Sequence, residues 1–375
     1  MRFADLLTYA DIDHLKRMAL HYGCGEDEHS KNELITSLLY YLGGSARLKE
    51  ELDALTSAEF RFLQQICLDS RRVFSKEELL GKGRACLGEG EESPRDLVIT
   101  GLRKGWLFPV VAGKNKALLE VPEDLRHRFL QLFAKMYSDQ EKEVTPTAYR
   151  SEEGLMEEDL HRFLQFLSRQ DVRLTADGAI YRHQQRQLMK SLHIAEEAVS
   201  RKGWRFGFGR RYHQYPDRFS LLYDYAYYRG YIVEDEWEGI VHLSESGVEK
   251  IRNYRLEEGK EIYRFWLRLY RHPIPQLAVI VKWIDLLSHR RWIATHTVKK
   301  VVENWLNSFY YAGEDELFQQ LIRMMMHLGM LQIGETESKR KLIKMTSRGH
   351  AWVNGISGFT ERTLDREYLE VSVQK

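Results

Sequence analysis

One arrangement occurs three times along the chain and constrains its fold more than any other feature. In each copy, a segment with helical periodicity ends at a glycine, an apolar strand follows, and a polar turn leads to a second apolar strand. The glycine fits the position just after a helix, where a positive φ angle costs glycine little. The three copies run from Gly105 to Val121, from Gly230 to Leu243, and from Gly329 to Met345.

A helix that leads into a two-stranded hairpin is typical of a winged helix-turn-helix, in which the hairpin is the wing. Most other segments read as helix, since apolar residues such as Leu34, Leu38 and Leu42 share one helical face. We therefore predict a mainly α fold with small β-hairpin wings, of the α+β class. The predicted parts are a helical segment at 1–50, winged-helix units at 51–140, 150–255 and 256–356, and a C-terminal tail at 357–375.

The first fifty residues differ from the repeated units. A helix is predicted over residues 6–19, a break follows at Gly23 and Gly25, and a second helix opens at Lys31. The run at 31–35, KNELI, resembles the start of a helix in the SAP-like family of small nucleic-acid-binding modules. The segment contains six basic and eight acidic residues, which argues against strong phosphate binding.

Composition sets limits on the class of protein. Apolar residues make up 43% of the chain, which is enough for a core and excludes disorder as the main state. Three cysteines exclude a disulfide framework and a four-cysteine zinc site. The formal net charge is +1, so any nucleic-acid surface must be local. The apolar run at 277–281 is too short to cross a bilayer. We expect a cytoplasmic protein, with association with the nucleoid as the alternative.

Several short segments resemble one known family. They are GLRKGWL at 101–107, VPEDL at 121–125, VRLTADG at 172–178 and YLEVSVQ at 368–374. Their order is similar to that in large bacterial proteins that carry a helicase-associated, XPB N-terminal-like region, where a Leu-Pro-Arg-Glu-Val segment follows the first wing. The resemblance implies winged-helix folding and an association with DNA repair or transcription. In longer relatives the last segment opens a further domain.

The helicase motor that accompanies this region elsewhere has no counterpart in the sequence. The run from Gly81 to Arg84 is too short for a phosphate-binding loop and lacks its hydroxyl residue. We predict no enzymatic activity, no cofactor and no metal, because no histidine has metal-ligand spacing. The histidines considered are His183, His289, His296 and His350.

Three basic groups are candidates for nucleic-acid binding, since cations interleaved with aromatic residues suit phosphate contact and base stacking. Residues 201–230 contain seven basic and two acidic side chains, a net charge of +5. The alternative for that stretch is a connector whose aromatic rings pack inward. The candidates are Arg201, Lys202, Arg205, Arg210 and Arg211; Arg290, Arg291, Lys299 and Lys300 around Trp292; and Lys339, Arg340, Lys341 and Lys344 on the third wing.

The second wing has the opposite character. Its acidic residues Glu234, Asp235, Glu236 and Glu238 would repel DNA, which favours a structural or protein-contact role. The tyrosines at 223–231 surround a helix, so we expect some of them to face solvent or a partner. The favoured function is non-catalytic DNA binding, as an accessory to a helicase, repair or transcription complex. The alternative is a protein-interaction scaffold whose winged helices do not contact DNA.

Overall fold

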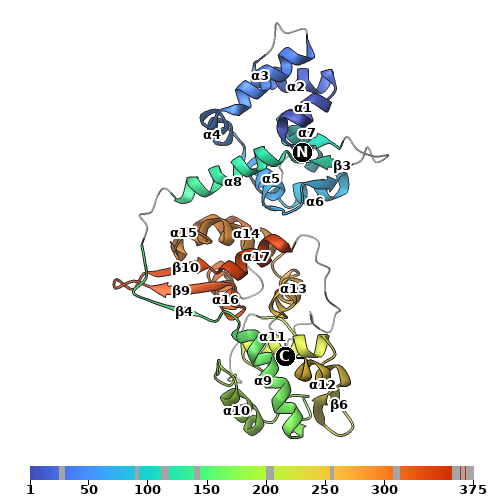
Figure 1. Cartoon of the computed structure of the whole chain (residues 1–375), viewed down its shortest axis with the longest axis vertical. Coiled ribbons are helices and arrows are strands. Elements are labelled where there is room, and N and C mark those ends of the chain that lie inside the picture. The colour runs from blue at the N-terminus through green and yellow to red at the C-terminus, as the bar shows by residue number, and fades with distance from the viewer. Residues whose placement is uncertain are drawn as a thin grey trace. The chain divides into compact units, whose positions relative to one another are not determined.

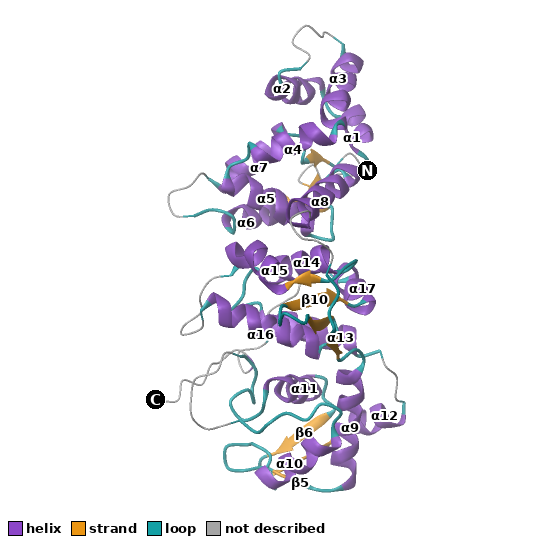
Figure 2. Ribbon diagram, turned by 90° about the vertical axis from the view of Figure 1, so that its left-hand side faces the viewer, coloured by secondary structure: helices purple, strands orange, loops and turns teal. Residues whose placement is uncertain are grey.

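The chain forms two compact units, residues 1–142 and 143–375. It is mainly helical with small antiparallel sheets, as the sequence predicts (Figures 1 and 2). Among the described residues, no helix combines the length and apolar character needed to cross a membrane. The computed structural model describes residues 1–24, 30–88, 93–110, 118–138, 144–199, 207–253, 257–306, 313–356, 364 and 368.

The N-terminal segment contains four helices, whereas the sequence predicts two. The predicted single helix over residues 6–19 is wrong, because the chain leaves the helical conformation at Ala10 and Asp11. The side chain of Asp11 accepts a hydrogen bond of 2.7 Å from the backbone N–H of His14 and so starts a new helix. The four helices of this segment are α1 (Phe3–Tyr9), α2 (Ile12–Tyr22), α3 (Lys31–Gly43) and α4 (Ser45–Asp53).

The same order of elements then occurs three times: a helix, a short strand, two helices and a hairpin. The first repeat contains α5 (Ser57–Leu68), β1 (Val73–Ser75), α6 (Lys76–Arg84), α7 (Pro94–Arg103), β2 (Phe108–Pro109) and β3 (Leu118–Glu120). The second contains α9 (Leu155–Arg169), β5 (Val172–Arg173), α10 (Arg182–Ser191), α11 (Asp217–Tyr228), β6 (Ile232–Asp235) and β7 (Ile240–Leu243). The third contains α14 (Leu277–Ser288), β8 (Ile293–Ala294), α15 (Thr295–Val302), α16 (Glu314–His327), β9 (Leu331–Glu335) and β10 (Lys341–Met345).

Strand pairing is also the same in the three repeats. The last strand of each repeat lies between the other two, which gives the orders β1-β3-β2, β5-β7-β6 and β8-β10-β9. The predicted glycines end the helix before each hairpin, with φ angles of 68° at Gly105, 66° at Gly230 and 72° at Gly329. In each case the N–H of the next residue bonds to a carbonyl five residues back, at 2.8–2.9 Å, which closes the helix end. The repeated arrangement predicted from the sequence is confirmed at these positions.

The second and third repeats share a further feature after the hairpin. Ser244 caps α12 (Glu245–Arg252) and Thr346 caps α17 (Ser347–Gly355), each by accepting a hydrogen bond from the N–H three residues on. That N–H belongs to Gly247 or Gly349, where a Cβ would lie 2.1 Å from the carbonyl oxygen of Tyr231 or 2.6 Å from that of Met330. The first repeat is followed instead by the long helix α8 (Glu123–Ser138).

The third sheet gains a strand from a distant part of the chain. Strand β4 (Ala148–Ser151) pairs antiparallel with β9, with Tyr149 opposite Gly334. Figure 1 shows this strand, in green, alongside the β9–β10 hairpin. The segment precedes the second repeat in sequence, so the second and third repeats are joined by shared structure within one unit.

Helix α11 lies at the centre of the C-terminal unit. It packs on α9, on α16 and on α13 (Gly259–Tyr270), and residues 218–226 are all buried. Among the tyrosines, Tyr223 and Tyr225 belong to the core, and Tyr228 is 40% exposed. The expectation that some of these rings face outward therefore holds for Tyr228.

Candidate nucleic-acid interface

The first basic group divides into two parts. Arg201, Lys202 and Arg205 lie outside the described residues. Arg210 and Arg211 are described, and both guanidinium groups pair with the carboxylate of Glu234 on β6, at 3.3 Å and 2.5 Å. The Arg210 guanidinium also lies 3.6 Å from the ring centroid of Tyr227.

This pairing gives a structural role to Glu234, one of the four acidic residues of the second hairpin. Burial alone would raise the pKa of Glu234, but the hydrogen bonds and charge of Arg211, with the charge of Arg210, hold that pKa below its usual value. Glu234 therefore neutralises two arginines within the protein. Phe208 and Tyr212 of the same segment are buried, as in the connector interpretation. We do not place Arg210 and Arg211 in the interface.

The helices that precede the second and third hairpins, α11 and α16, pack against each other. Asp217 at the start of α11 accepts a hydrogen bond of 2.9 Å from Gln320 and lies 3.6 Å from the guanidinium of Arg323 on α16. On α16, the described side chains are otherwise exposed mainly at its acidic N-terminus, Glu314 to Glu316. These two helices are therefore not free to enter a nucleic-acid groove.

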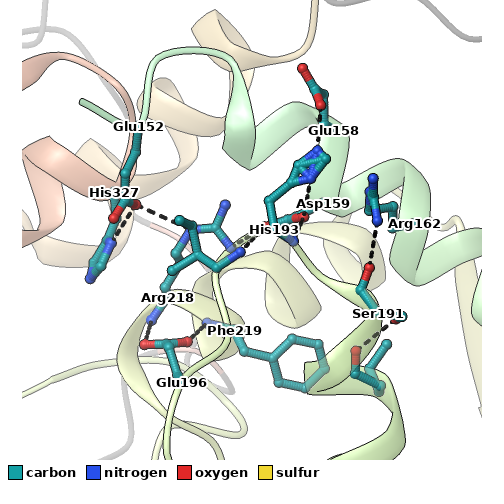
Figure 3. A network of polar contacts seen from close by, with 12 residues as sticks. Glu152, Glu158, Asp159, Arg162, Ser191, His193, Glu196, Arg218, Phe219 and His327 are labelled. Carbon is teal, nitrogen blue, oxygen red and sulfur yellow. Dashed lines mark hydrogen bonds and ion pairs between the residues drawn. The ribbon is translucent and has the colours of Figure 1, made fainter. Parts of the chain in front are cut away.

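A buried network of charges holds this packing together (Figure 3). Arg218 of α11 is fully buried and lies 2.7 Å from Asp159 of α9 and 3.6 Å from Glu152, which follows β4. His327 at the end of α16 lies 2.8 Å from the same Glu152 carboxylate. Glu196 accepts hydrogen bonds from the first two N–H groups of α11 that follow Asp217, and burial raises its pKa. The network ties the second repeat to the third.

The second basic group is partly engaged. Lys299 forms an ion pair with Asp315, and the Nε of Arg290 donates a hydrogen bond of 3.1 Å to His289. Arg290 and Lys300 are exposed, whereas Arg291 is half-buried. The group therefore offers two exposed cations beside the third sheet.

The third basic group has fewer ion pairs among the described residues than the other two groups. Lys339 and Lys341 are exposed and Lys344 is half-buried, and within the described part of the chain their ammonium groups have no ion-pair partner. Arg340 is half-buried. Lys339 lies at the hairpin turn with a φ of 59°, which points to a tight connection between β9 and β10. The structure thus places three unpaired lysines on one hairpin.

An aromatic pair lies beside this hairpin, and sequence reasoning did not find it. The rings of Tyr149 on β4 and Trp292 before β8 lie with their centroids 5.7 Å apart, at an angle of 55°. Tyr149 is 62% exposed. The signal in the sequence was the short run of strand-forming residues after Pro146, but its pairing with β9 is far too distant in sequence to be read from local pattern.

A cavity of about 440 Å³ lies between β4, β9 and α16, and Tyr149 is among its lining residues. Ile322, Met326 and Ile333 line its floor, and Arg150 and Lys341 contribute cationic side chains. Arg150 pairs with Glu152 at 2.5 Å. Glu335 also lines the cavity, so its lining carries charges of both signs.

One cluster has the residue types of a metal site but not the geometry. Ligand atoms of Asp285, His289 and His350 lie within 4.8 Å of one another. The two imidazole rings are stacked, 4.6 Å apart and 16° from parallel, so their nitrogen lone pairs lie in parallel planes and do not converge on one ion. His350 lies 2.7 Å from Asp285, and Asn354 donates to the same carboxylate. The carboxylate of Asp285 is therefore already engaged in contacts with His350 and Asn354.

Comparison with family models, with curated proteins and with solved structures finds no match to this chain.

Proposed function

We propose that the chain is a non-catalytic nucleic-acid-binding protein built from three winged-helix units, and that it contacts the phosphate backbone through the third hairpin. The observation that carries the proposal is the set of unpaired lysines on that hairpin, Lys339, Lys341 and Lys344. Flexible ammonium groups on a hairpin suit backbone neutralisation, which positions a protein on DNA without reading its sequence.

The interior helices support contact by the hairpin rather than by a recognition helix. In a helix-turn-helix protein the helix before the hairpin usually enters the major groove. Here α11 and α16 occupy that place in the second and third units, and they pack on each other. Any nucleic acid would therefore contact the hairpin and the sheet edge of the third unit. The same unit also contains the exposed cations Lys300 and Arg290.

Binding of a labelled duplex at several salt concentrations tests this proposal. Each phosphate neutralised adds roughly −0.9 to the slope of log K against log salt, so replacing the three lysines with alanine should flatten the slope by up to about 2.7. A control variant replaces Lys16, Lys49 and Lys76, which are exposed in the N-terminal unit, and changes the net charge equally. Equal slopes for the two variants would refute the proposed role of the third hairpin.

A protein-interaction scaffold remains a second candidate because of the second hairpin. Trp237 at its turn is fully exposed, between the acidic residues Glu236 and Glu238. The two carboxylates would repel phosphate, and an exposed indole is typical of a contact with a protein partner. The resemblance to helicase-associated proteins leads us to propose a helicase or repair protein as that partner.

A further inference from the structure

Beyond phosphate contact, the outer face of the third sheet has the chemistry to hold unpaired bases. We propose that Tyr149 and Trp292 form a stacking platform, so that the preferred ligand is single-stranded nucleic acid rather than a continuous duplex. This inference rests on the proposed nucleic-acid binding and specifies its substrate class.

The platform is assembled by strand register. Tyr149, Gly334, Leu342 and Ala294 lie opposite one another in four adjacent strands, so they share one face of the sheet. Trp292 lies over this row at Gly334, where a Cβ would be 3.1 Å from the indole Cζ3 and 2.6 Å from Pro146. The glycine leaves room for the indole, and the indole lies beside the tyrosine.

The two rings contact each other, as their centroid distance of 5.7 Å shows, and the ring of Tyr149 also stays open to a ligand. Their angle of 55° is far from parallel, and 62% of Tyr149 is exposed, whereas most large aromatic residues of this unit are buried. An aromatic ring left open on a sheet face is available to an unpaired base, because every base has a flat π-face. In a duplex those faces are already stacked on neighbouring base pairs.

The charge of this face fits a nucleic acid. The next row on the same face contains Ser151, Gln332 and Lys344, about 7 Å along the strands at 3.4 Å per residue. Neither row contains a carboxylate, because Glu335 belongs to the alternate row with Ala148 and Lys341 and points to the other face. A strand whose bases meet Tyr149 would therefore pass its phosphates near Lys344 and the hairpin.

The test compares four ligands with Tyr149→Ala, using the full chain and fluorescence anisotropy. The ligands are an oligothymidine, an abasic strand of equal length, a blunt duplex and a proline-rich peptide. Loss of one stacked base should weaken oligothymidine binding about 5- to 100-fold. Binding of the abasic strand and the duplex should not change, because they offer phosphates but no free base faces.

Two further variants separate stacking from folding and from charge. Tyr149→Phe keeps the ring and should bind oligothymidine like the parent, and Tyr149→Leu should behave like Tyr149→Ala. If Tyr149→Ala binds oligothymidine as the parent does, while loss of the three hairpin lysines still flattens the salt dependence, stacking is wrong and phosphate binding stands. If the parent binds none of the nucleic acids, both are wrong. Binding of the peptide alone would assign this face to a protein partner and overturn the inference.

Discussion

The second and third repeats have the same architecture but differ in whether their cationic side chains are ion-paired. Both have the same order of elements, the same strand order, a positive-φ glycine before the hairpin and a capping Ser or Thr after it. In the second, Arg210 and Arg211 are paired with Glu234. In the third, the hairpin lysines have no such partner among the described residues. The same architecture therefore has ion-paired arginines in the second repeat and, among the described residues, lysines without an ion-pair partner in the third.

The two repeats differ at one matched position of the hairpin. Glu234 is the fourth residue after Gly230, and the fourth residue after Gly329 is Ile333. Both lie in the first strand of a hairpin, opposite Val241 and Ile343 respectively. The carboxylate at this position in the second repeat pairs with Arg210 and Arg211, whereas the third repeat has an apolar side chain there.

The charge network between the two repeats gives the largest expected effect. Replacing Arg218 with alanine removes the arginine that pairs with the buried carboxylate of Asp159, and it leaves Glu152 with Arg150 as its remaining arginine partner. The loss should lower the free energy of unfolding by about 3–5 kcal/mol. Arg323 is exposed, and its contact with Asp217 should contribute less than about 1 kcal/mol, so Arg323→Ala is the control. Urea unfolding measures both. Similar losses in the two variants would mean that the network does not join the repeats.

Removing the Glu234 carboxylate from the second hairpin should lower the free energy of unfolding somewhat less than Arg218→Ala does. Glu234→Ala leaves two half-buried arginines without their partner and should lower the free energy of unfolding by about 2–4 kcal/mol. Because the pKa of Glu234 is lowered in the folded state, its contribution is present above the unfolded pKa near 4.5 and is lost as the pH falls through the lower folded value. The gap in stability between parent and variant should therefore narrow as the pH falls below about 4. A constant gap from neutral to acid pH would count against the ion pairs.

Replacing Gly230 or Gly329, the glycines before the second and third hairpins, should have a smaller effect on stability. Both have positive φ, so alanine at either should cost about 1–2 kcal/mol from backbone strain alone. A Cβ at Gly230 meets nothing within 4 Å, whereas one at Gly329 would lie 2.8 Å from the Cα of Glu153 and 3.0 Å from the carbonyl oxygen of Glu152. Gly329→Ala should therefore lower the thermal midpoint more than Gly230→Ala. The reverse order would show that the join between β4 and the third repeat is loose.

Trp237 should give the smallest change in stability. It is fully exposed at the second hairpin turn, so Trp237→Ser should leave the free energy of unfolding within about 0.5 kcal/mol of the parent. It should also leave nucleic-acid affinity unchanged, because the second hairpin lies outside the proposed interface. A clear loss of nucleic-acid binding would extend the interface to the second repeat and weaken the contrast between the two hairpins.

Local signals in the sequence were sufficient for the repeated hairpins. Gly105, Gly230 and Gly329 could be recognised because glycine commonly follows a helix end, where a positive φ costs it little. The break at Asp11 was missed because an N-cap inside an apolar periodic run looks like a helical residue.

The sites depend on contacts that are distant in sequence, and these could not be predicted. Strand β4 pairs with β9 across more than half of the C-terminal unit, which hid Tyr149 from any local pattern. Arg218 added to the positive charge of its segment, yet it lies in the core. Glu234 was assigned to a repelling surface, although its carboxylate neutralises two arginines. In each case the charge is visible in the sequence, but the partner that decides its role is not.

Lysine reactivity with and without nucleic acid tests the central claim most directly. The protein is labelled with an amine-reactive ester in the absence and presence of a saturating oligonucleotide, and each lysine is quantified by mass spectrometry. Lys339, Lys341 and Lys344 should lose reactivity, whereas Lys190 of the second repeat and Lys16 of the N-terminal unit should not. Protection of Lys190 or Lys16, with the hairpin lysines unchanged, would contradict the assignment of nucleic-acid contact to the third repeat.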